Sequence, residues 1–190
     1  MQIGEEEAAQ VEAWRRGDPE AVRQVVALHG AALLRVALAI CPQAEDAEEV
    51  VQDAMLRAHR SIASFDADRG SLRGWLVGVT VNRARQVRRG HARYGSFLAR
   101  FRREPYVPGS PAATHGDLDF ARRRLAEIPA REREAFVLVD IEELTSAEAA
   151  RAMGVSGSTV RVLLGRARRR LEETAAVSPV RSLRVEGTGK

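Results

Sequence analysis

The chain has 190 residues, which is enough for one ordinary domain or two small ones. Hydrophobic residues make up 45% and aromatic residues only 5%, so we expect a core of Leu, Val and Ala, which favours helices over a β-sandwich or barrel. The single cysteine, Cys41, excludes a disulfide framework, and the four scattered histidines do not form a zinc site. We therefore expect no metal, no cofactor and no catalytic residues.

Charge is spread unevenly along the chain, whose formal net charge is +4. Residues 1–68 hold 13 acidic residues and 6 arginines, whereas residues 69–124 hold 13 arginines and 3 acidic residues. Residues 151–170 carry six more arginines and no acidic residue. These two basic tracts predict a polyanionic partner, because each arginine near a phosphate releases condensed counterions. A GC-rich genome also explains arginine in place of lysine, but it does not explain the clustering.

The sequence predicts a soluble intracellular protein without membrane insertion. Met1 is followed closely by the acidic run 5–7, which is unlike the basic start of a signal peptide. The longest apolar stretch, 31–41, contains Arg35 and falls far short of the ~20 residues that a membrane span needs.

Apolar residues at helical spacing predict four helices in the first half of the chain. The second of them has a clear start, because Asp18 is a suitable cap and Pro19 suits the first helical position. The third carries acidic and amide side chains along its outer face. The four helices are expected at 5–16, 18–41, 44–62 and 71–89, with a loop at 65–70 between the last two.

The second half of the chain begins with a predicted linker and then returns to helices. Residues 91–116 lose helical periodicity and gain glycine, serine and proline. Thr145 and Glu148 form a capping box, and Ser156 is a second cap after the turn at Gly154. The helices are expected at 117–128, 130–142, 145–153 and 156–173, followed by a disordered tail at 175–190.

The two capped helices around Gly154 match the helix-turn-helix plan. The alternative is an ordinary helical hairpin with a solvated basic face. An arginine near the start of the second helix, such as Arg161, is placed for a bidentate contact to guanine in the major groove. Arg168 and Arg170 lie nearer the C-terminal end, where we expect contacts to phosphates at most. The candidates for contact with DNA are Ser158, Thr159, Arg161, Val162, Gly165, Arg166 and Arg169.

Several segments of the chain resemble bacterial sigma factors. The segment 128–136 and the string 144–171, with its Leu-Thr-Ser-Ala-Glu, Gly-Val-Ser, Thr-Val-Arg and Arg-Ala-Arg-Arg-Arg-Leu motifs, resemble sigma domain 4. The segments 44–53 and 65–76, which include Phe-Asp-Ala-Asp-Arg-Gly and Gly-Trp-Leu, resemble sigma domain 2. Two matches in this order without an intervening domain resemble the extracytoplasmic-function (ECF) group of the sigma-70 family.

The resemblance implies an all-α protein of two small helical domains joined by a flexible linker. The domain 2-like part is expected at 1–90, the linker at 91–116, the domain 4-like helix-turn-helix at 117–174 and the disordered tail at 175–190. The implied function is transcription initiation without enzymatic activity. Such a protein binds core RNA polymerase, directs it to promoters by reading the −10 and −35 elements, and helps to melt the −10 region.

The resemblance also implies partners and residues that bind them. The partners are the β′ clamp helices and β flap of core RNA polymerase, promoter DNA and an anti-sigma factor, in the cytoplasm and at the nucleoid. The acidic stripe of the third helix matches the surface that docks on the clamp helices. Taken alone, such a stripe is typical of a solvated face, and a metal site there would lack histidine. The polymerase-binding candidates are Glu45, Glu48, Glu49, Gln52 and Asp53.

The loop at 65–70 and the helix after it match the family's reader of the −10 element, where a base is flipped from the non-template strand. Aromatic rings can stack on bases, an amide can read a base edge, and arginines can neutralise phosphates. The spacing of Trp75 with Leu72 and Leu76 also fits a core position. The −10 candidates are Phe65, Asp66, Arg69, Arg73, Trp75, Asn82, Arg83 and Arg85.

The sequence departs from the family pattern at a few positions. Gln86 stands where many members have Asp, and Ala149 replaces a larger aliphatic residue. Val162 and Gly165 replace polar or larger side chains in the second helix of the motif, so the recognition pattern is expected to rely on Arg161 and Arg166.

Two other classes of protein compete with this interpretation. A transcriptional regulator with a GerE-like C-terminal domain has a similar recognition helix, but the acidic helix and the loop at 65–70 argue against it. A metal-dependent nuclease needs converging carboxylates, whereas those of this chain line one helix face.

Overall fold

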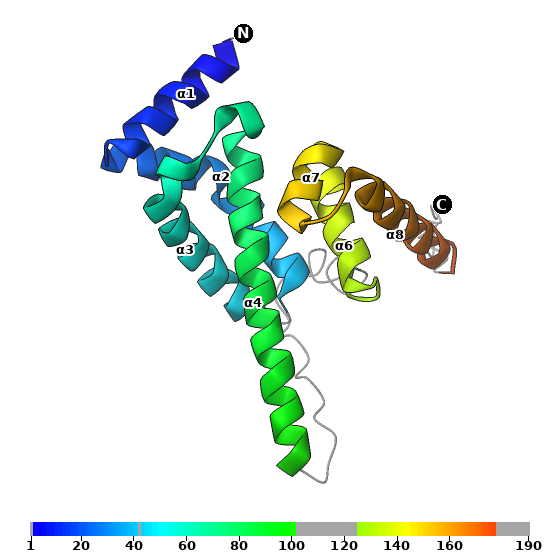
Figure 1. Cartoon of the computed structure of the whole chain (residues 1–190). Helices are drawn as coiled ribbons and strands as arrows, with labels where there is room; N and C mark the ends of the chain where they lie inside the picture. Colours follow the sequence, from blue (N-terminus) through cyan, green and yellow to red (C-terminus); the bar gives the residue numbers. More distant parts are fainter. Residues whose placement is uncertain (1, 42, 102–124, 178–190) are drawn as a thin grey trace, which may run out of the picture.

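The computed structural model of the protein describes residues 2–41, 43–101 and 125–177. All the regular structure in these residues is helical (Figure 1). In the first half, Asp18 accepts a hydrogen bond from the backbone N–H of Glu20 at 2.8 Å, and Pro19 opens the helix, as the sequence predicted. The elements of this half are α1 (Gln2–Arg15), α2 (Pro19–Ile40), α3 (Ala44–Ser61), the 3₁₀ turns η1 (Ile62–Ser64) and η2 (Ala67–Arg69), and α4 (Leu72–Phe101).

The second half contains the predicted helix-turn-helix. The capping box of Thr145 and Glu148 is present, and Gly154 ends the first helix of the motif in the left-handed conformation, with φ of +64°. The predicted helix at 130–142 is an α-helix that continues as one π-helical segment. The elements are α6 (Ala130–Phe136), η3 (Val137–Ile141), α7 (Ser146–Met153) and α8 (Gly157–Val177).

The predicted boundary between the fourth helix and the linker is wrong, because α4 continues through residues 91–101. A glycine inside a helix costs only about 1 kcal/mol relative to alanine, so Gly90 weakens the helix without ending it. The predicted tail is also shorter at its start, since α8 extends to Val177. Residues 102–116 of the predicted linker, the start of the predicted helix at 117–128 and residues 178–190 lie outside the described residues.

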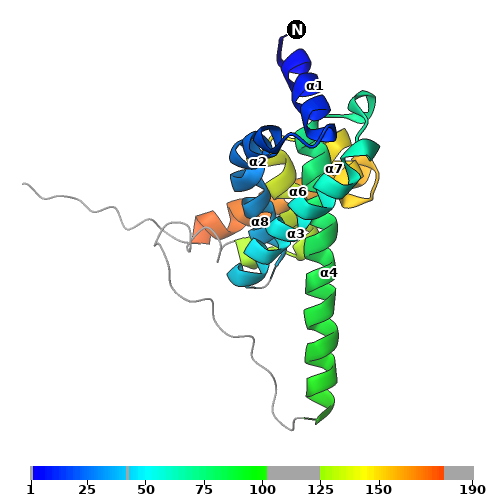
Figure 2. The same cartoon turned by 90° about the vertical axis from the view of Figure 1, so that its left-hand side faces the viewer.

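The two halves share one core, which the sequence did not predict. A single cluster of contacting buried side chains runs from Val11 and Trp14 in α1 to Met153 and Val160 in the helix-turn-helix. Figure 1 shows α4 with α1 and α3 on one side and α6, α7 and α8 on the other. The C-terminal end of α4 extends well beyond both groups (Figure 2).

Helix α2 lies at the centre of this arrangement and contacts α1, α3, α4 and α6. By length and composition alone, it is apolar enough to cross a membrane. Nine of its residues are nevertheless buried in the folded chain, including Leu33 and Val36. Its apolar character is therefore accounted for by the shared core.

Helices α4 and α7 approach closely at Gly78. A Cβ atom added to Gly78 would lie 3.7 Å from the Cα of Ala152, which is ordinary van der Waals contact for a methyl group and leaves no room for a longer side chain. The same addition at Gly90, further along α4, would meet nothing within 4 Å. Gly78 therefore marks a point where the backbones of α4 and α7 approach closely.

We predict that Gly78→Leu separates the two halves while each keeps its helices, because leucine favours the helix but overfills the contact with α7. Small-angle scattering of the free protein should give a larger radius of gyration with unchanged far-UV circular dichroism. Gly90→Leu is the matched control and should leave the radius unchanged. An unchanged radius for Gly78→Leu would contradict the close packing of α4 on α7.

Candidate nucleic-acid interface

The loop between α3 and α4 is built from two short turns with their own hydrogen bonds. Asp66 caps the second turn by accepting from the backbone N–H of Asp68 at 3.0 Å, and Gly70 ends it with φ of +143°. The ring of Phe65 is buried and lies against Trp75 with ring centroids 5.7 Å apart. Phe65, a predicted DNA contact, therefore packs against the inner side of the loop in this conformation. Trp75 is half-buried and packs against the core, as its spacing indicated, while part of its side chain stays exposed.

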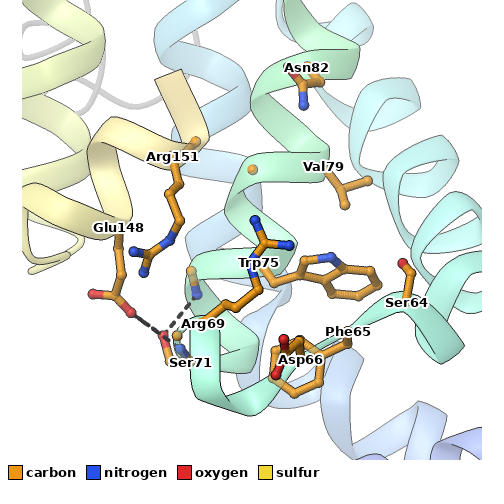
Figure 3. A pocket seen from close by; sticks show the side chains of 14 residues that line it. Ser64, Phe65, Asp66, Arg69, Ser71, Trp75, Val79, Asn82, Glu148 and Arg151 are labelled. Atoms are coloured by element: carbon orange, nitrogen blue, oxygen red, sulfur yellow. Dashed lines mark hydrogen bonds between the residues drawn. The ribbon is translucent and has the colours of Figure 1, made fainter. Parts of the chain in front are cut away.

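This loop and α4 line a cavity of about 280 Å³ whose opposite wall is α7 (Figure 3). Glu148 and Arg151 of α7 face the loop across it. The cavity combines aromatic rings, an amide and a guanidinium, the groups that can hold an extruded base. Five of the predicted −10 residues line it: Phe65, Asp66, Arg69, Trp75 and Asn82.

The other three predicted −10 residues are arginines that form ion pairs with carboxylates. Arg83 pairs with Asp53 and lies 3.8 Å from a carboxylate oxygen of Glu49, both on α3. Arg73 and Arg85 pair instead with glutamates of the second half of the chain. In this conformation, carboxylates occupy the guanidinium groups that we expected to meet phosphates.

Glu142 and Glu134 bind these arginines from buried positions. The side chain of Glu142 is 0% exposed and accepts from Arg73 at 2.6 Å and from Arg35 at 2.6 and 3.0 Å. The side chain of Glu134 is 1% exposed and accepts from Arg85 at 2.5 Å. We call these five side chains the interdomain clasp. Hydrogen bonding to Glu142 raises the pKa of Arg35 above its ordinary value.

Glu148 makes a further link between the halves. One of its carboxylate oxygens accepts from the hydroxyl of Ser71 at 2.5 Å, at the start of α4, and the other accepts from Thr145 in the capping box. Burial opposes its ionisation, but the hydrogen bonds from Ser71 and Thr145 outweigh burial and lower the pKa of Glu148. Its stabilising effect is therefore complete at neutral pH and is lost as the pH falls through the lowered pKa.

The acidic stripe of α3 faces solvent over most of its length. Glu45, Glu48, Glu49 and Gln52 are exposed, whereas Asp53 is half-buried and paired with Arg83 and Arg57. Leu56, one turn after Gln52, is 55% exposed and extends the stripe with an apolar side chain. The sequence analysis missed Leu56, although its i+4 spacing from Gln52 was enough to find it.

Helix α8 presents all of its predicted DNA contacts on the surface. The hydroxyl of Ser156 accepts from the backbone N–H of Thr159 at 3.2 Å and so caps the helix. Val160, Leu164 and Ala167 are buried beneath it. The exposed residues are Ser158, Thr159, Arg161, Val162, Gly165, Arg166 and Arg169.

Two arginines in the second half of α8 hold it to its own domain. Arg168 donates to both carboxylate oxygens of Asp140 at 2.9 and 2.6 Å, and Arg170 donates to Glu132 at 2.8 Å. In this conformation, carboxylates of η3 and α6 bind both guanidinium groups, so the expectation of contacts to phosphates at most stays a prediction for Arg168 and Arg170. Within the described ranges, no group of three or more His, Cys, Asp or Glu residues is arranged to hold a metal ion.

Comparison with known proteins identifies the family. Residues 25–94 match Sigma-70 region 2, and residues 121–171 match Sigma-70, region 4. The ECF RNA polymerase sigma factor SigM of Mycobacterium tuberculosis is 34% identical over 157 residues, which cover 82% of this chain and 77% of SigM. The chain belongs to the ECF sigma factor family. The RNA polymerase sigma factor CnrH of Cupriavidus metallidurans is 31% identical over 169 residues, covering 82% and 86% of the two chains.

Two solved structures share the fold of this ECF sigma factor. CnrH in complex with the cytosolic domain of CnrY has a TM-score of 0.66 and 26% identity, over 91% of this chain and 99% of CnrH. RpoE of Bartonella quintana in complex with the anti-sigma factor NepR has a TM-score of 0.68 and 26% identity, over 83% and 98% of the two chains. The predicted family, all-α fold and function are confirmed: the protein is a transcription initiation factor that directs RNA polymerase to promoters.

We predict that the double substitution Glu134→Gln and Glu142→Gln loosens the contact between the halves. Removing one partner of a buried ion pair typically costs about 3–5 kcal/mol, and this applies most closely to Arg85, which is only 12% exposed and would lose the carboxylate of Glu134. Arg35 and Arg73 are 51% and 35% exposed, so water compensates part of their loss of Glu142. Hydrogen exchange of the free protein should become faster in residues 73–85 of α4 and in α7.

The matched control replaces Glu127 and Glu173, which are exposed acids of the same domain, by glutamine. This control should leave exchange unchanged. If the clasp variant exchanges like the wild type, the buried glutamates do not hold the halves together.

Proposed function

We propose that this sigma factor docks on core RNA polymerase through the α3 stripe, binds the −10 strand at the cavity beside α4 and reads the −35 duplex with α8. The observation that carries the proposal is the exposure of every predicted −35 residue on one face of α8. The ion pairs of Arg168 and Arg170 lie toward the far end of that helix and leave this face accessible.

Arg161 is the best placed side chain for reading a base. It is exposed in the first turns of α8, between the buried Val160 and Leu164 along the chain, and it therefore points away from the core. The first turns of a recognition helix are the part that enters the major groove. Arg161 is accordingly assigned a bidentate contact to guanine, and Arg166 and Arg169 are assigned to the backbone or to further bases.

At the −10 element, the cavity beside the loop receives a base of the separated non-template strand. Trp75 offers a stacking face, and Asn82 offers an amide that can pair with a base edge. Arg73 and Arg85 neutralise the phosphates of that strand once the carboxylates of the clasp have left them. A DNA strand and the clasp therefore compete for the same guanidinium groups.

Promoter binding therefore requires the two halves to separate. The centres of the −10 and −35 elements lie about 25 base pairs apart, which is about 85 Å along the duplex at ~3.4 Å per base pair. A compact chain of this length is roughly 40 Å across. The conformation with a shared core is assigned to the free protein, and core polymerase is the scaffold that holds the open one.

The similar structures favour an additional partner. CnrH is bound to CnrY, and RpoE is bound to the anti-sigma factor NepR. We assign an anti-sigma factor to this chain as well, which binds the protein before core polymerase does. The protein is assigned to the cytoplasm, at the nucleoid when bound to polymerase, with no enzymatic activity of its own.

Run-off transcription with purified core polymerase tests the proposed function. The protein should direct core polymerase to start at promoters with matching −10 and −35 elements, and the free protein should bind the same duplexes weakly. Tight, sequence-specific binding of duplex DNA by the free protein, without any effect on core polymerase, would favour a regulator instead.

We predict that Arg161→Ala flattens base preference at one or two −35 positions, since a bidentate base contact contributes about 1–3 kcal/mol of discrimination. Transcription from a library of −35 variants measures the preference. Arg168→Ala is the matched control, because Arg168 is bound to Asp140, and it should keep the parental preference. A parental preference in Arg161→Ala would exclude base reading by this residue.

We predict that Glu45→Lys with Glu48→Lys weakens binding to core polymerase at least tenfold without changing helical content. Both side chains are exposed, so their reversal should alter stability by no more than about 0.5 kcal/mol. They test docking better than Asp53, whose loss would also leave Arg83 without its partner. Reversal of Glu5 and Glu6, exposed acids of α1, is the control. If the Glu45 and Glu48 variant competes with the wild type for core polymerase as well as the Glu5 and Glu6 control does, docking through α3 is refuted.

A further inference from the structure

One face of α1 lies against the segment that joins α3 to α4. Glu7, Val11, Trp14 and Arg15 are separated by four, seven and eight positions, the spacing of a single helix face. Val11 and Trp14 are buried at 3% and 1% exposure. The match to Sigma-70 region 2 begins only at residue 25, so α1 lies outside it.

Three polar contacts connect this face to successive parts of the segment. The indole N–H of Trp14 donates to Nδ1 of His59 at 2.8 Å, near the end of α3. Arg15 Nη2 donates to the carbonyl oxygen of Phe65 at 2.6 Å, inside the loop. The carboxylate of Glu7 accepts from the backbone N–H of Leu72, the first residue of α4. Helix α1 thus holds the segment at its entry, its middle and its exit.

These polar contacts supplement the packing of Phe65, because side chains do not fill all of the space between α1 and the loop. A cavity of about 620 Å³ lies between α1 and the loop and is lined by residues such as Glu7, Arg15 and Ser71. Arg15 is itself fixed by an ion pair to Glu12 at 2.6 Å. Glu7 satisfies a free N–H at the start of α4, where a negative charge also interacts favourably with the helix dipole.

We propose that Arg15 and Glu7 are positioning residues that set the geometry of the −10 reading loop. Neither side chain lines the cavity assigned to the flipped base; both act on the backbone that carries the residues lining it. Arg15 holds the carbonyl of Phe65, which is directly followed by Asp66, and Glu7 holds the N-terminus of the helix that carries Trp75. This inference rests on the assignment of the loop to the −10 element.

The test measures base preference with core polymerase bound to the full chain. Short single-stranded oligonucleotides that carry each base at each −10 position serve as the probe. Arg15→Ala should reduce the preference for the best base over the others about five- to tenfold, because the loop loses its fixed backbone position. Arg15→Lys keeps a donor for one carbonyl and should restore most of the preference. Glu7→Ala should act in the same direction, and the two losses should not add, because both residues hold one loop.

Arg16→Ala is the matched control, since it removes the same charge from the adjacent, exposed position. It should leave the preference unchanged. A loss of affinity in Arg15→Ala that is equal for all oligonucleotides, with the salt slope reduced by about 0.7, would mean that Arg15 binds a phosphate of the single strand and would overturn the proposal.

Two other results also have a definite meaning. An unchanged preference in Arg15→Ala, or a loss that Arg15→Lys does not restore, would overturn positioning by the Arg15 side chain. If the wild-type complex itself shows no base preference, the assignment of the loop to the −10 element is wrong, and the result does not concern positioning by Arg15.

Discussion

The arrangement of the two halves depends on carboxylates that are buried and must be paired. Glu142 and Glu134 are almost completely removed from solvent, and an uncompensated charge in such a place costs several kcal/mol. Their closest partners are Arg35, Arg73 and Arg85, all from the first half of the chain. Two of these arginines are among those assigned to the −10 strand. In the proposed function, a single set of guanidinium groups therefore serves both the closed conformation and DNA.

This sharing explains how a stable closed form can still open. A buried ion pair contributes little net stability, because the cost of removing both charges from water offsets much of their attraction. In the open form that we propose, Glu134 and Glu142 regain water, and Arg73 and Arg85 bind phosphates in place of carboxylates. The apolar contacts between the halves, such as those of α4 with α7 around Gly78, are then lost. Under the proposal, the free energy of binding to core polymerase through the separate surface on α3 has only to exceed that loss.

Local patterns predicted the helices, the caps and the exposed face of α8 well, because each of those signals lies within one or two helical turns. The capping box of Thr145 and the cap at Ser156 are examples. The contacts between the halves could not be predicted in this way. Glu134 sits in an alternating Arg-Glu pattern typical of a solvated helix, and its partner Arg85 is 49 positions away. The contact of Arg15 could not be predicted either, because its acceptor, the carbonyl oxygen of Phe65, is 50 positions away. The burial of the Phe65 ring beneath the loop likewise gave no signal in the local sequence. Gly90 led to an error of another kind: it predicted the end of a helix that in fact continues. The cost of one glycine was outweighed by good helix formers on both sides.

The most direct test of the account is a distance between the two halves, measured in the free protein and in the transcribing complex. Labels at exposed positions 63 in η1 and 147 in α7, introduced as Ala63→Cys and Ala147→Cys with Cys41→Ala, lie on opposite sides of the interface. Pulsed electron paramagnetic resonance should give one short, narrow distance for the free protein. With core polymerase and promoter DNA, that distance should be replaced by one several tens of ångströms longer. A distance that stays short in a complex that is transcribing would contradict competition between the clasp and DNA.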